Sequence, residues 1–324
     1  MFGSTIRSFT GRLWLTLFAA TSVALSEPPV TALAFAPDDS LLASGSSRQI
    51  HLRSSKDGRI LRSIACNLPK VRSVLFSQDS KFLIVGGGEP GVRGDAQIFA
   101  LINSAQPRLI GNHTDLVNAV ANSADGLSLG MASSDHTARV WKWDGIGISD
   151  PLPTLTLAGH SGPVTAIQFS PSGKTILTAS MDRSIKVWDA NDGRLIRSFN
   201  HHTEAVHALA FRPIMNGDTH TTPTAASAGD DRTVRIWQPE IGRMVRIIRN
   251  HEGPIFALAW STDGASLFSA GKEGIVRRLS GSSDAVESQW SLSPDWIYAL
   301  AVNSDGTRLV YADWSGNVGI QRLK

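Results

Sequence analysis

Cysteine is almost absent from this sequence. Cys66 is the only one in 324 residues, so no disulfide bond can form within the chain. Stability must therefore come from packing. If the protein is exported, this favours a bacterial periplasm or surface over a eukaryotic extracellular space.

A strong charge of either sign is also missing. Lys and Arg number 31 against 28 Asp and Glu, a net charge of +3. Such a chain has no general electrostatic attraction for nucleic acid or anionic membranes. We therefore expect neither as a partner. Low-complexity stretches and linkers rich in Pro or Ser are absent as well, so one folded domain is expected over residues 27–324.

The apolar run LWLTLFAATSVAL has 13 residues, too few to span a bilayer comfortably, which takes about 20. It follows Arg7 and Arg12 and precedes small residues at 22–26, the three-part pattern of a secretory signal peptide. We expect residues 1–26 to be a cleaved export signal. Loss of the two arginines lowers Lys plus Arg from 31 to 29 against 28 acids, a mature net charge of +1. The mature protein is then periplasmic or extracellular and is not inserted in a membrane.

Recognisable catalytic and metal-binding motifs are missing too. Four histidines lie close in the sequence, but no Asp, Cys or second His stands at metal-ligand spacing on a shared strand; they are His201, His202, His207 and His220. The stretch GGGEPGVRG lacks the Gly-Lys-Ser/Thr ending of a phosphate-binding loop and is expected to be a turn. We therefore assign no catalytic residue, metal or cofactor.

What the sequence does contain is a repeated hexad similar to V-x-[AS]-[LIV]-x-[FW]. Seven such segments occur, at residues 30–35, 71–76, 117–122, 164–169, 206–211, 255–260 and 297–302. The starts are 41, 46, 47, 42, 49 and 42 residues apart, a period typical of repeat proteins with four short strands per unit.

The most regular unit covers residues 157–199. Apolar residues alternate in VTAIQF, TILTAS, IKVWD and RLIRSF, and the turn compositions SPSG, MDRS and ANDG separate these segments. Four strands in this order form an antiparallel meander that cannot bury both faces alone. Stacking such sheets around a ring predicts an all-β fold, a seven-bladed β-propeller of four-stranded antiparallel blades.

This unit resembles the WD40-repeat propellers, through Gly159-His160 before the first strand and Trp188-Asp189 at the end of the third. The resemblance implies a buried structural tetrad of His160, Thr178, Asp182 and Trp188. The carboxylate can accept from the imidazole, whose other nitrogen can meet the hydroxyl, which can meet the indole N–H. We expect these polar side chains to stabilise the fold and not to catalyse a reaction.

The other units match less closely. The third keeps His113, Asp135 and Trp141 but has Met131 at the hydroxyl position, and the fifth keeps all four as His202, Ser227, Asp231 and Trp237. In the sixth, His251 remains and the spacing places Lys272 and Arg278 at the Asp and Trp positions. The first, second and seventh units lack the tetrad, with Arg53, Phe99 and Gln321 at the Trp position.

Two classes of function fit this fold. WD40 resemblance implies a non-catalytic platform for protein–protein interaction, here acting outside the cytoplasm. The alternative is a propeller enzyme or a small-ligand binder with a site in the central channel. The inner strands are rich in Ala and largely apolar, as in TALAF, HALAF and YALAV, and this favours packing over chemistry.

Another protein is therefore the expected partner, and loop positions suggest where it binds. In this topology the loop into the first strand and the turn between the second and third strands open on one face. The candidate contact residues there are Phe256, Trp296, Tyr298, Trp314, Lys70 and Arg72. Four aromatic residues on two adjacent blades are typical of a binding hot spot. Alternatively, Trp296 and Trp314 fill the space left by the missing tetrad Trp.

Closure of the ring conflicts with the export signal. After VGIQRLK no sequence remains for an outer strand of the seventh blade. WD40 rings usually take this strand from the N-terminus, and the spacing places it at residues 19–23, inside the signal. If the signal is cleaved, the last blade lacks its outer strand. If residues 1–26 are retained as the closing strand, the protein stays in the cytoplasm or tethered.

Overall fold

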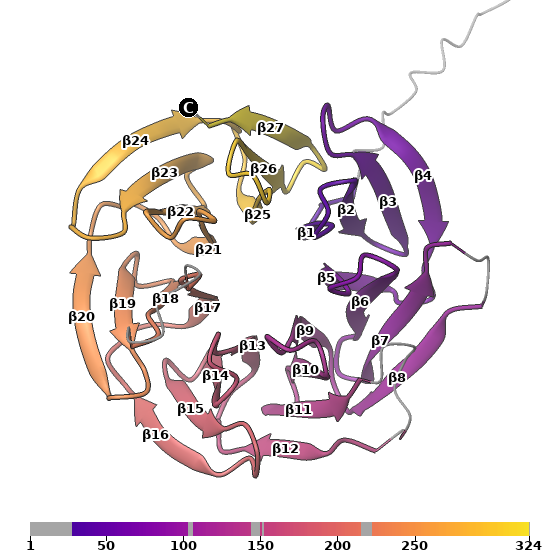
Figure 1. Ribbon diagram of the computed structural model, residues 1–324, viewed down its shortest axis with the longest axis horizontal. Coiled ribbons are helices and arrows are strands. Elements are labelled where there is room, and N and C mark those ends of the chain that lie inside the picture. The colour runs from indigo at the N-terminus through magenta and orange to yellow at the C-terminus, as the bar shows by residue number, and fades with distance from the viewer. Residues whose placement is uncertain (1–27, 103–105, 144–149, 151, 215–221, 324) are drawn as a thin grey trace, which may run out of the picture.

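The computed structural model describes residues 28–102, 106–143, 150, 152–214 and 222–323. Within these residues the chain forms 27 strands and no helix. The strands make seven sheets arranged as blades around a central axis (Figure 1). The predicted seven-bladed propeller is confirmed.

Each of the first six blades is a four-stranded antiparallel sheet, and the seventh has three strands. Blades 1 to 4 contain β1 (Ala32–Phe35), β2 (Leu41–Ser46), β3 (Gln49–Ser54), β4 (Ile60–Ala65), β5 (Lys70–Phe76), β6 (Phe82–Glu89), β7 (Arg93–Ala100), β8 (Arg108–His113), β9 (Val117–Asn122), β10 (Ser128–Ser133), β11 (Thr137–Lys142), β12 (Leu155–Ala158), β13 (Val164–Phe169), β14 (Thr175–Ser180), β15 (Ile185–Asp189) and β16 (Leu195–Phe199). Blades 5 to 7 contain β17 (Val206–Phe211), β18 (Ala225–Gly229), β19 (Val234–Gln238), β20 (Arg243–Ile248), β21 (Ile255–Trp260), β22 (Ser266–Gly271), β23 (Ile275–Ser280), β24 (Val286–Ser291), β25 (Ile297–Val302), β26 (Arg308–Asp313) and β27 (Val318–Arg322).

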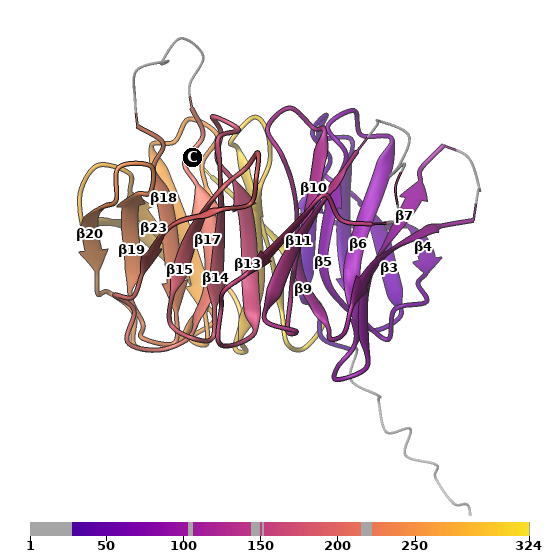
Figure 2. The ribbon, with the colours of Figure 1, turned by 90° about the horizontal axis from the view of Figure 1, so that it is seen from below.

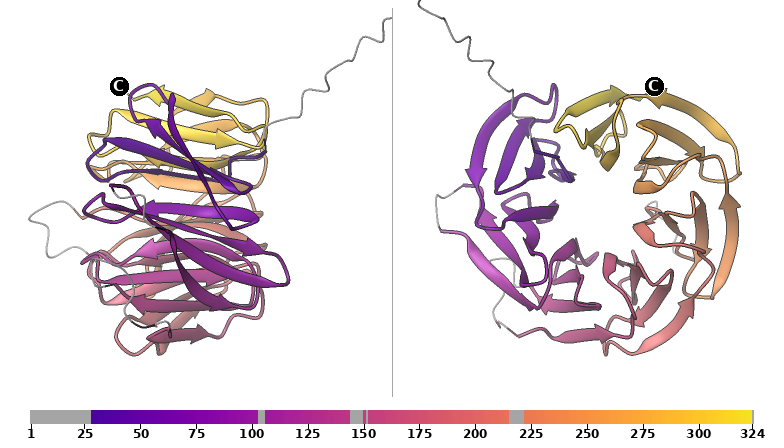
Figure 3. Two further views of the ribbon diagram at one scale, coloured as in Figure 1. Left: turned by 90° about the vertical axis from the view of Figure 1, so that its right-hand side faces the viewer. Right: turned by 180° about the vertical axis from the view of Figure 1, so that it is seen from behind.

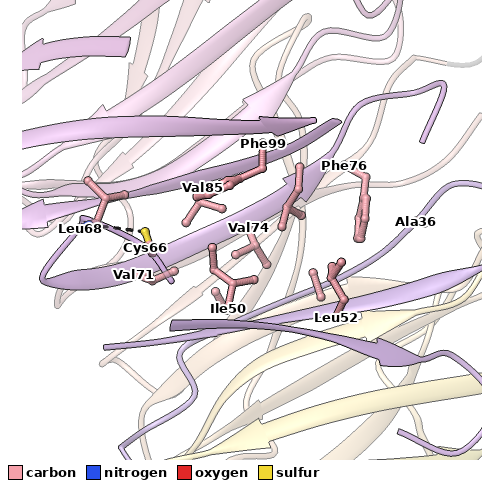
Figure 4. Close-up of a cluster of buried hydrophobic side chains, with 13 residues drawn as sticks. Ala36, Ile50, Leu52, Cys66, Leu68, Val71, Val74, Phe76, Val85 and Phe99 are labelled. Atoms are coloured by element: carbon pink, nitrogen blue, oxygen red, sulfur yellow. Dashed lines mark hydrogen bonds between the residues drawn. The ribbon is translucent and has the colours of Figure 1, made fainter. Parts of the chain in front are cut away.

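The hydrophobic core lies between blades. Figure 4 shows the cluster in which Ile50 and Leu52 of β3 pack against Val71, Val74 and Phe76 of β5. The first residue of every hexad is at most 4% exposed, so this position recurs because each blade needs an apolar side chain against its neighbour.

The glycine-rich stretch of residues 86–94 contains the expected turn, but most of the stretch belongs to β6 and β7. Gly87 pairs with Val71, and the turn is confined to residues 90–92. A Cβ on Gly87 would lie 1.9 Å from the carbonyl oxygen of Lys70. Glycine is therefore needed for the close approach of two strands.

Blades 7 and 1 meet through turns and inner strands. The carboxylate of Asp39 in blade 1 accepts hydrogen bonds from the Ser304 amide (3.0 Å) and hydroxyl (2.6 Å) in blade 7. The Arg308 guanidinium also donates to the Ser55 carbonyl at 2.6 Å. Among the described residues no fourth strand pairs with β27, as expected for the last blade (Figure 3). Residues 19–23, the alternative closing strand, lie outside the described residues.

Candidate functional site

A β-bulge lies at the start of the first strand in six blades. The register skips the second residue of the hexad in β5, β9, β13, β17, β21 and β25. A bulge leaves its extra residue out of the pairing ladder and re-aims the side chain. Here these side chains turn toward the central channel.

The inner strands of all seven blades line a section of the central channel with a volume of about 200 Å³. The second hexad residues form one ring in this lining, namely Thr31, Arg72, Asn118, Thr165, His207, Phe256 and Tyr298. The third hexad residues, Ala in six blades and Ser73 in the other, lie beside them. Small side chains are needed where seven strands converge.

Three members of the ring tie neighbouring blades together. The side chains of Thr31, Asn118 and Thr165 donate to the carbonyls of Val71, Val164 and Val206 at 2.6, 2.9 and 2.6 Å. Each acceptor is the first hexad residue of the next blade. In blades 2, 6 and 7 the equivalent residues Arg72, Phe256 and Tyr298 make no such bond within the described part of the chain. These positions are therefore not needed for this inter-blade contact.

The four aromatic residues expected to gather do so. Phe256 and Tyr298 stack with centroids 4.9 Å apart and planes 6° apart. Trp296 lies 5.9 Å from Phe256 and 6.2 Å from Tyr298, and Trp314 lies 5.6 Å from Tyr298. We name Phe256, Trp296, Tyr298 and Trp314 the aromatic patch.

The two tryptophans of the aromatic patch are open to solvent. Trp296 is 39% exposed and Trp314 is 51% exposed, while Phe256 and Tyr298 are half-buried. The backbone joins the tryptophans directly, because the Trp314 amide donates to the Trp296 carbonyl at 2.9 Å. Side chains this exposed do not fill a core position.

The two predicted basic residues lie on blade 2, separated from the aromatic patch by blade 1. Arg72 lines the channel and interacts electrostatically with Tyr298. Its side chain is exposed to the channel, but the surrounding blades displace part of the water around the guanidinium, and this partial desolvation lowers the pKa of Arg72 from its ordinary value. Lys70 is exposed, and no described aromatic ring lies against it.

Sequence reasoning missed two residues next to the aromatic patch. The His207 ring packs edge-on against Phe256 with centroids 5.5 Å apart, and its Nε2 lies 2.8 Å from Asp230 Oδ1. Lys272 places its Nζ 5.2 Å from the centroid of Trp296. His207 could have been found, because it holds the same hexad position as Phe256 and Tyr298.

The tetrad side chains of blade 4 form a continuous buried chain of hydrogen bonds. His160 Nδ1 lies 2.8 Å from Asp182 Oδ2, and its Nε2 lies 2.7 Å from Thr178 Oγ1. The Trp188 indole N–H donates to the same hydroxyl at 2.8 Å. Since a carboxylate only accepts, Nδ1 donates to Asp182 and Nε2 accepts from Thr178.

The charges of this tetrad follow from its burial. Burial lowers the pKa of His160, against the effect of Asp182. Burial also opposes ionisation of Asp182, but hydrogen bonds from Ser184 and His160 outweigh it and lower its pKa to about 2. The pair is therefore a neutral imidazole beside a carboxylate near neutral pH.

Blades 3 and 5 have the tetrad residues that the sequence indicated. In blade 5, His202 lies 2.7 Å from both Asp231 and Ser227, and Trp237 donates to Ser227 at 2.8 Å. In blade 3, His113 lies 2.8 Å from Asp135. Its buried Nε2 has no hydrogen-bond partner among the described residues, because Met131 replaces the hydroxyl.

The assignment of Lys272 and Arg278 to the Asp and Trp positions of blade 6 was wrong by one residue. Ser269 pairs with Arg277 as Thr178 pairs with Lys186, which places Glu273 and Leu279 at those positions. Glu273 accepts from the Glu252 amide at 2.9 Å and forms an ion pair with Arg277. His251 keeps its bond to Ser269 at 2.8 Å, and its Nδ1 has no partner within the described residues.

Blades 1, 2 and 7 have other residues at the Trp position, as expected. In blade 1 the Arg53 Nε donates to the Ser44 hydroxyl at 2.9 Å, the role the indole plays in blade 4. Phe99 and Gln321 pair with Leu83 and Leu309 in the matching register.

The described residues contain no group of His, Cys, Asp and Glu that could hold a metal ion. His202 belongs to the tetrad and His201 packs against Trp237, while His220 lies outside the described residues. In the same part of the chain no helix is long and apolar enough to cross a membrane.

Comparison with solved structures supports the fold. The WD40 beta propeller domain of Doa1 matches with a TM-score of 0.75 over 91% of this chain and 93% of that chain, at 22% identity. This similarity is evidence for the fold alone.

Among curated proteins, nuclear distribution protein nudF 2 of Penicillium rubens is 33% identical over 131 residues, which are 35% of this chain and 27% of that protein. Pre-mRNA-processing factor 19 of Bos taurus is 25% identical over 188 residues, 57% of this chain and 36% of that protein. COMPASS component SWD3 of Saccharomyces cerevisiae is 34% identical over 98 residues, 30% of this chain and 29% of that protein. The matched part of the chain thus spans between 27% and 36% of the length of these relatives.

The family described as "WD domain, G-beta repeat" matches five segments that together cover more than half of the chain, at residues 21–54, 106–142, 151–189, 193–238 and 242–278. The seven blades and the hydrogen-bonded tetrads agree with this match. The chain belongs to the WD40-repeat family of β-propellers.

Proposed function

We propose that this protein is a non-catalytic scaffold that binds another protein through the aromatic patch at the mouth of the central channel. The exposure of Trp296 and Trp314 beside the stacked pair Phe256 and Tyr298 is the observation that carries this proposal. Solvent-exposed Trp and Tyr on a rigid support lose little conformational entropy on binding and are enriched in hot spots.

The surroundings of the patch support the same function. Figure 2 shows the propeller from the side, with loops opening on two opposite faces. In blades 6 and 7 the patch lies on the face where the chain enters the inner strand and where the second strand turns into the third. The described residues that line the channel include no Asp, Glu or Cys. Beside this lining Asp230 lies 2.8 Å from the ring nitrogen of His207. The scaffold proposal therefore rests on the aromatic patch and not on an absence of titratable groups.

The test is capture of a partner with the mature chain as bait. Replacing Trp296 and Tyr298 together by Ala should abolish most of the capture while the fold remains intact. Equal capture by the wild-type and doubly substituted chains would place the binding surface elsewhere.

We also propose that the protein acts outside the cytoplasm, in the periplasm or beyond the cell. The proposal rests on the pattern of residues 1–26 alone. N-terminal sequencing of the protein from its native host tests it. A start near Leu25 or Glu27 supports export, and an intact Met1 supports retention of this segment as the closing strand.

A further inference from the structure

Arg72 is the one side chain with a permanent charge among the described residues that line the channel. Two arginines of the described residues are buried and both are paired with acids, Arg235 with Asp231 at 3.2 Å and Arg277 with Glu273, whereas Arg72 is exposed to the channel. No described carboxylate lies within ion-pair distance of Arg72, and no described group accepts a hydrogen bond from it. Its five N–H donors are therefore free to bind a group from outside.

The position of Arg72 does not follow from a structural need. Its equivalents Thr31, Asn118 and Thr165 bond the next blade, whereas Arg72 does not. The bulge at Val71 and Ser73 leaves Arg72 out of the β5–β6 ladder and directs its side chain to the channel. Arg72 is exposed to the water of the channel and has no ion-pair partner among the described residues, so its N–H groups can reach an incoming anion.

Charges of both signs lie around the mouth. Lys272 lies over Trp296, and Lys70 is exposed two residues before Arg72. Two acids lie nearby as well, and each is held by hydrogen bonds. Asp295 accepts from the Trp296 amide and the Ser315 hydroxyl, both at 2.8 Å, and Asp230 lies 2.8 Å from His207.

Tyr298 adds a neutral donor. Its hydroxyl makes no hydrogen bond in the described part of the chain, and its ring is held by Phe256. Burial raises the pKa of Tyr298, so the hydroxyl keeps its proton at neutral pH. Arg72 and Tyr298 both line the channel and interact electrostatically with each other, so blades 2 and 7 each offer hydrogen-bond donors to a group that enters it.

We propose that the partner inserts a carboxylate into the mouth of the channel, where Arg72 binds it and Tyr298 donates to it, while the aromatic patch contacts the adjoining residue. This inference rests on the proposed function and names the chemistry of the group bound. Arginine matches a carboxylate with two parallel hydrogen bonds. Phosphate groups are typically bound by a cluster of arginines. The described lining of the channel has a single arginine, Arg72. A cation is disfavoured because Arg72 repels it and Lys272 already covers Trp296.

The probes are acetylated, amidated tetrapeptides that differ at one position, Gly-Phe-X-Gly with X as Glu, Gln, Lys or phosphoserine. A fifth peptide, Gly-Phe-Gly with a free C-terminal carboxylate, distinguishes a chain end from a side chain. Binding to the full chain is followed by NMR, through the Arg72 Nε–Hε and tryptophan indole resonances. We expect the Glu peptide or the free C-terminus to bind roughly tenfold to a hundredfold tighter than the Gln peptide, as for a hydrogen bond to a charged group.

Arg72→Gln should reduce binding of the carboxylate peptide to that of the Gln peptide, and Arg72→Lys should restore part of it. Arg62→Gln, an equal charge change at an exposed residue of β4, should leave binding within about twofold. Thermal unfolding of each variant shows whether the fold is intact, and Arg72→Lys keeps the test valid if Arg72→Gln does not fold.

If the Lys or phosphoserine peptide binds more tightly than the Glu peptide, the carboxylate assignment is overturned. Equal affinities of the Glu and Gln peptides would also overturn it. Failure of this inference and of the proposed function are distinguishable. If Trp296 and Tyr298 are needed for partner capture but Arg72 is not, the protein-binding site stands and the carboxylate does not.

Discussion

The ring of Phe256 lies nearly parallel to the ring of Tyr298, with 4.9 Å between centroids, although the two residues belong to adjacent blades. Both are the bulged second residue of their hexads. The stack therefore depends on the repeat itself, because equivalent positions in neighbouring blades lie side by side around the channel. Trp296 and Trp314 extend this pair outward to solvent.

Trp314 has a matched control in blade 4. Met181 holds the same position, since its amide donates to the Pro163 carbonyl as that of Trp314 donates to the Trp296 carbonyl, both at 2.9 Å. Met181 is 50% exposed and Trp314 is 51% exposed. Trp314→Ala should weaken partner binding by about 2 kcal/mol, and Met181→Ala by no more than about 0.5 kcal/mol. Titration calorimetry with the captured partner measures both, and equal effects would count against the aromatic patch.

The tetrad of blade 4 should contribute to stability and not to binding. Asp182→Ala leaves the buried His160 Nδ1–H without its acceptor, which should lower the free energy of unfolding by about 1 to 3 kcal/mol. Asp192→Ala, at an exposed turn acid of the same blade, should change it little. Denaturant titration measures both. A loss of binding or of any activity in the Asp182 variant without a loss of stability would show a functional role.

His251 should make stability depend on pH. Burial and the nearby Arg277 lower its pKa from 6.5 to about 4. Between these values the unfolded chain binds a proton that the folded chain does not, so protonation favours unfolding. The contribution of neutral His251 to the free energy of unfolding is complete above pH 6.5. It falls by about 1.4 kcal/mol per pH unit as the pH drops toward 4.

The control for this prediction is His251→Gln, which should have a smaller slope of unfolding free energy against pH between about 6.5 and 4. The slopes due to His160 and His202, whose pKa values are also lowered by burial, remain in the variant. Identical slopes in the two proteins would mean that His251 is not desolvated in the fold.

Asp39 should hold the seam between blades 1 and 7. It adopts a positive φ of 55°, which Asn tolerates about as well as Asp, so Asp39→Asn tests its charge and acceptors with little change in backbone strain. The Asn side chain keeps one acceptor oxygen, so only part of the bonding to Ser304 is lost and stability should fall by about 1 kcal/mol. Asp38→Asn in the same turn loses only bonds to Ser40 and should have a smaller effect. Urea unfolding compares them, and equal effects would mean that Asp39 contributes nothing specific to closure.

The fold could be predicted from the sequence because the residues that repeat occupy buried positions. The first hexad residue is buried in every blade, so selection for packing leaves a period that can be counted. The register in blade 6 could not be predicted as safely. Blade 6 has no tetrad Trp to mark the register of β23. The prediction was therefore shifted by one residue and placed Lys272, instead of Glu273, at the tetrad Asp position.

The same slip hid part of the site. Lys272 was taken for the tetrad Asp position, whereas its amide donates to the Pro254 carbonyl in the same way as Trp314 and Met181 do to their partners. It therefore belongs to the rim, above Trp296. The gathering of the four aromatic residues was predicted from loop positions, but the stacking of Phe256 on Tyr298 and the isolation of Arg72 depend on contacts between blades, which one sequence does not reveal.

The aromatic patch is expected to bind the partner. The most direct measurement is the affinity of the captured partner for the Trp296→Ala, Tyr298→Ala double variant, together with its thermal unfolding. We expect binding to weaken by about 2 to 4 kcal/mol with Tm nearly unchanged. A sharp fall in Tm, with binding reduced only in proportion to the folded fraction, would show that these side chains support the fold and would contradict the account.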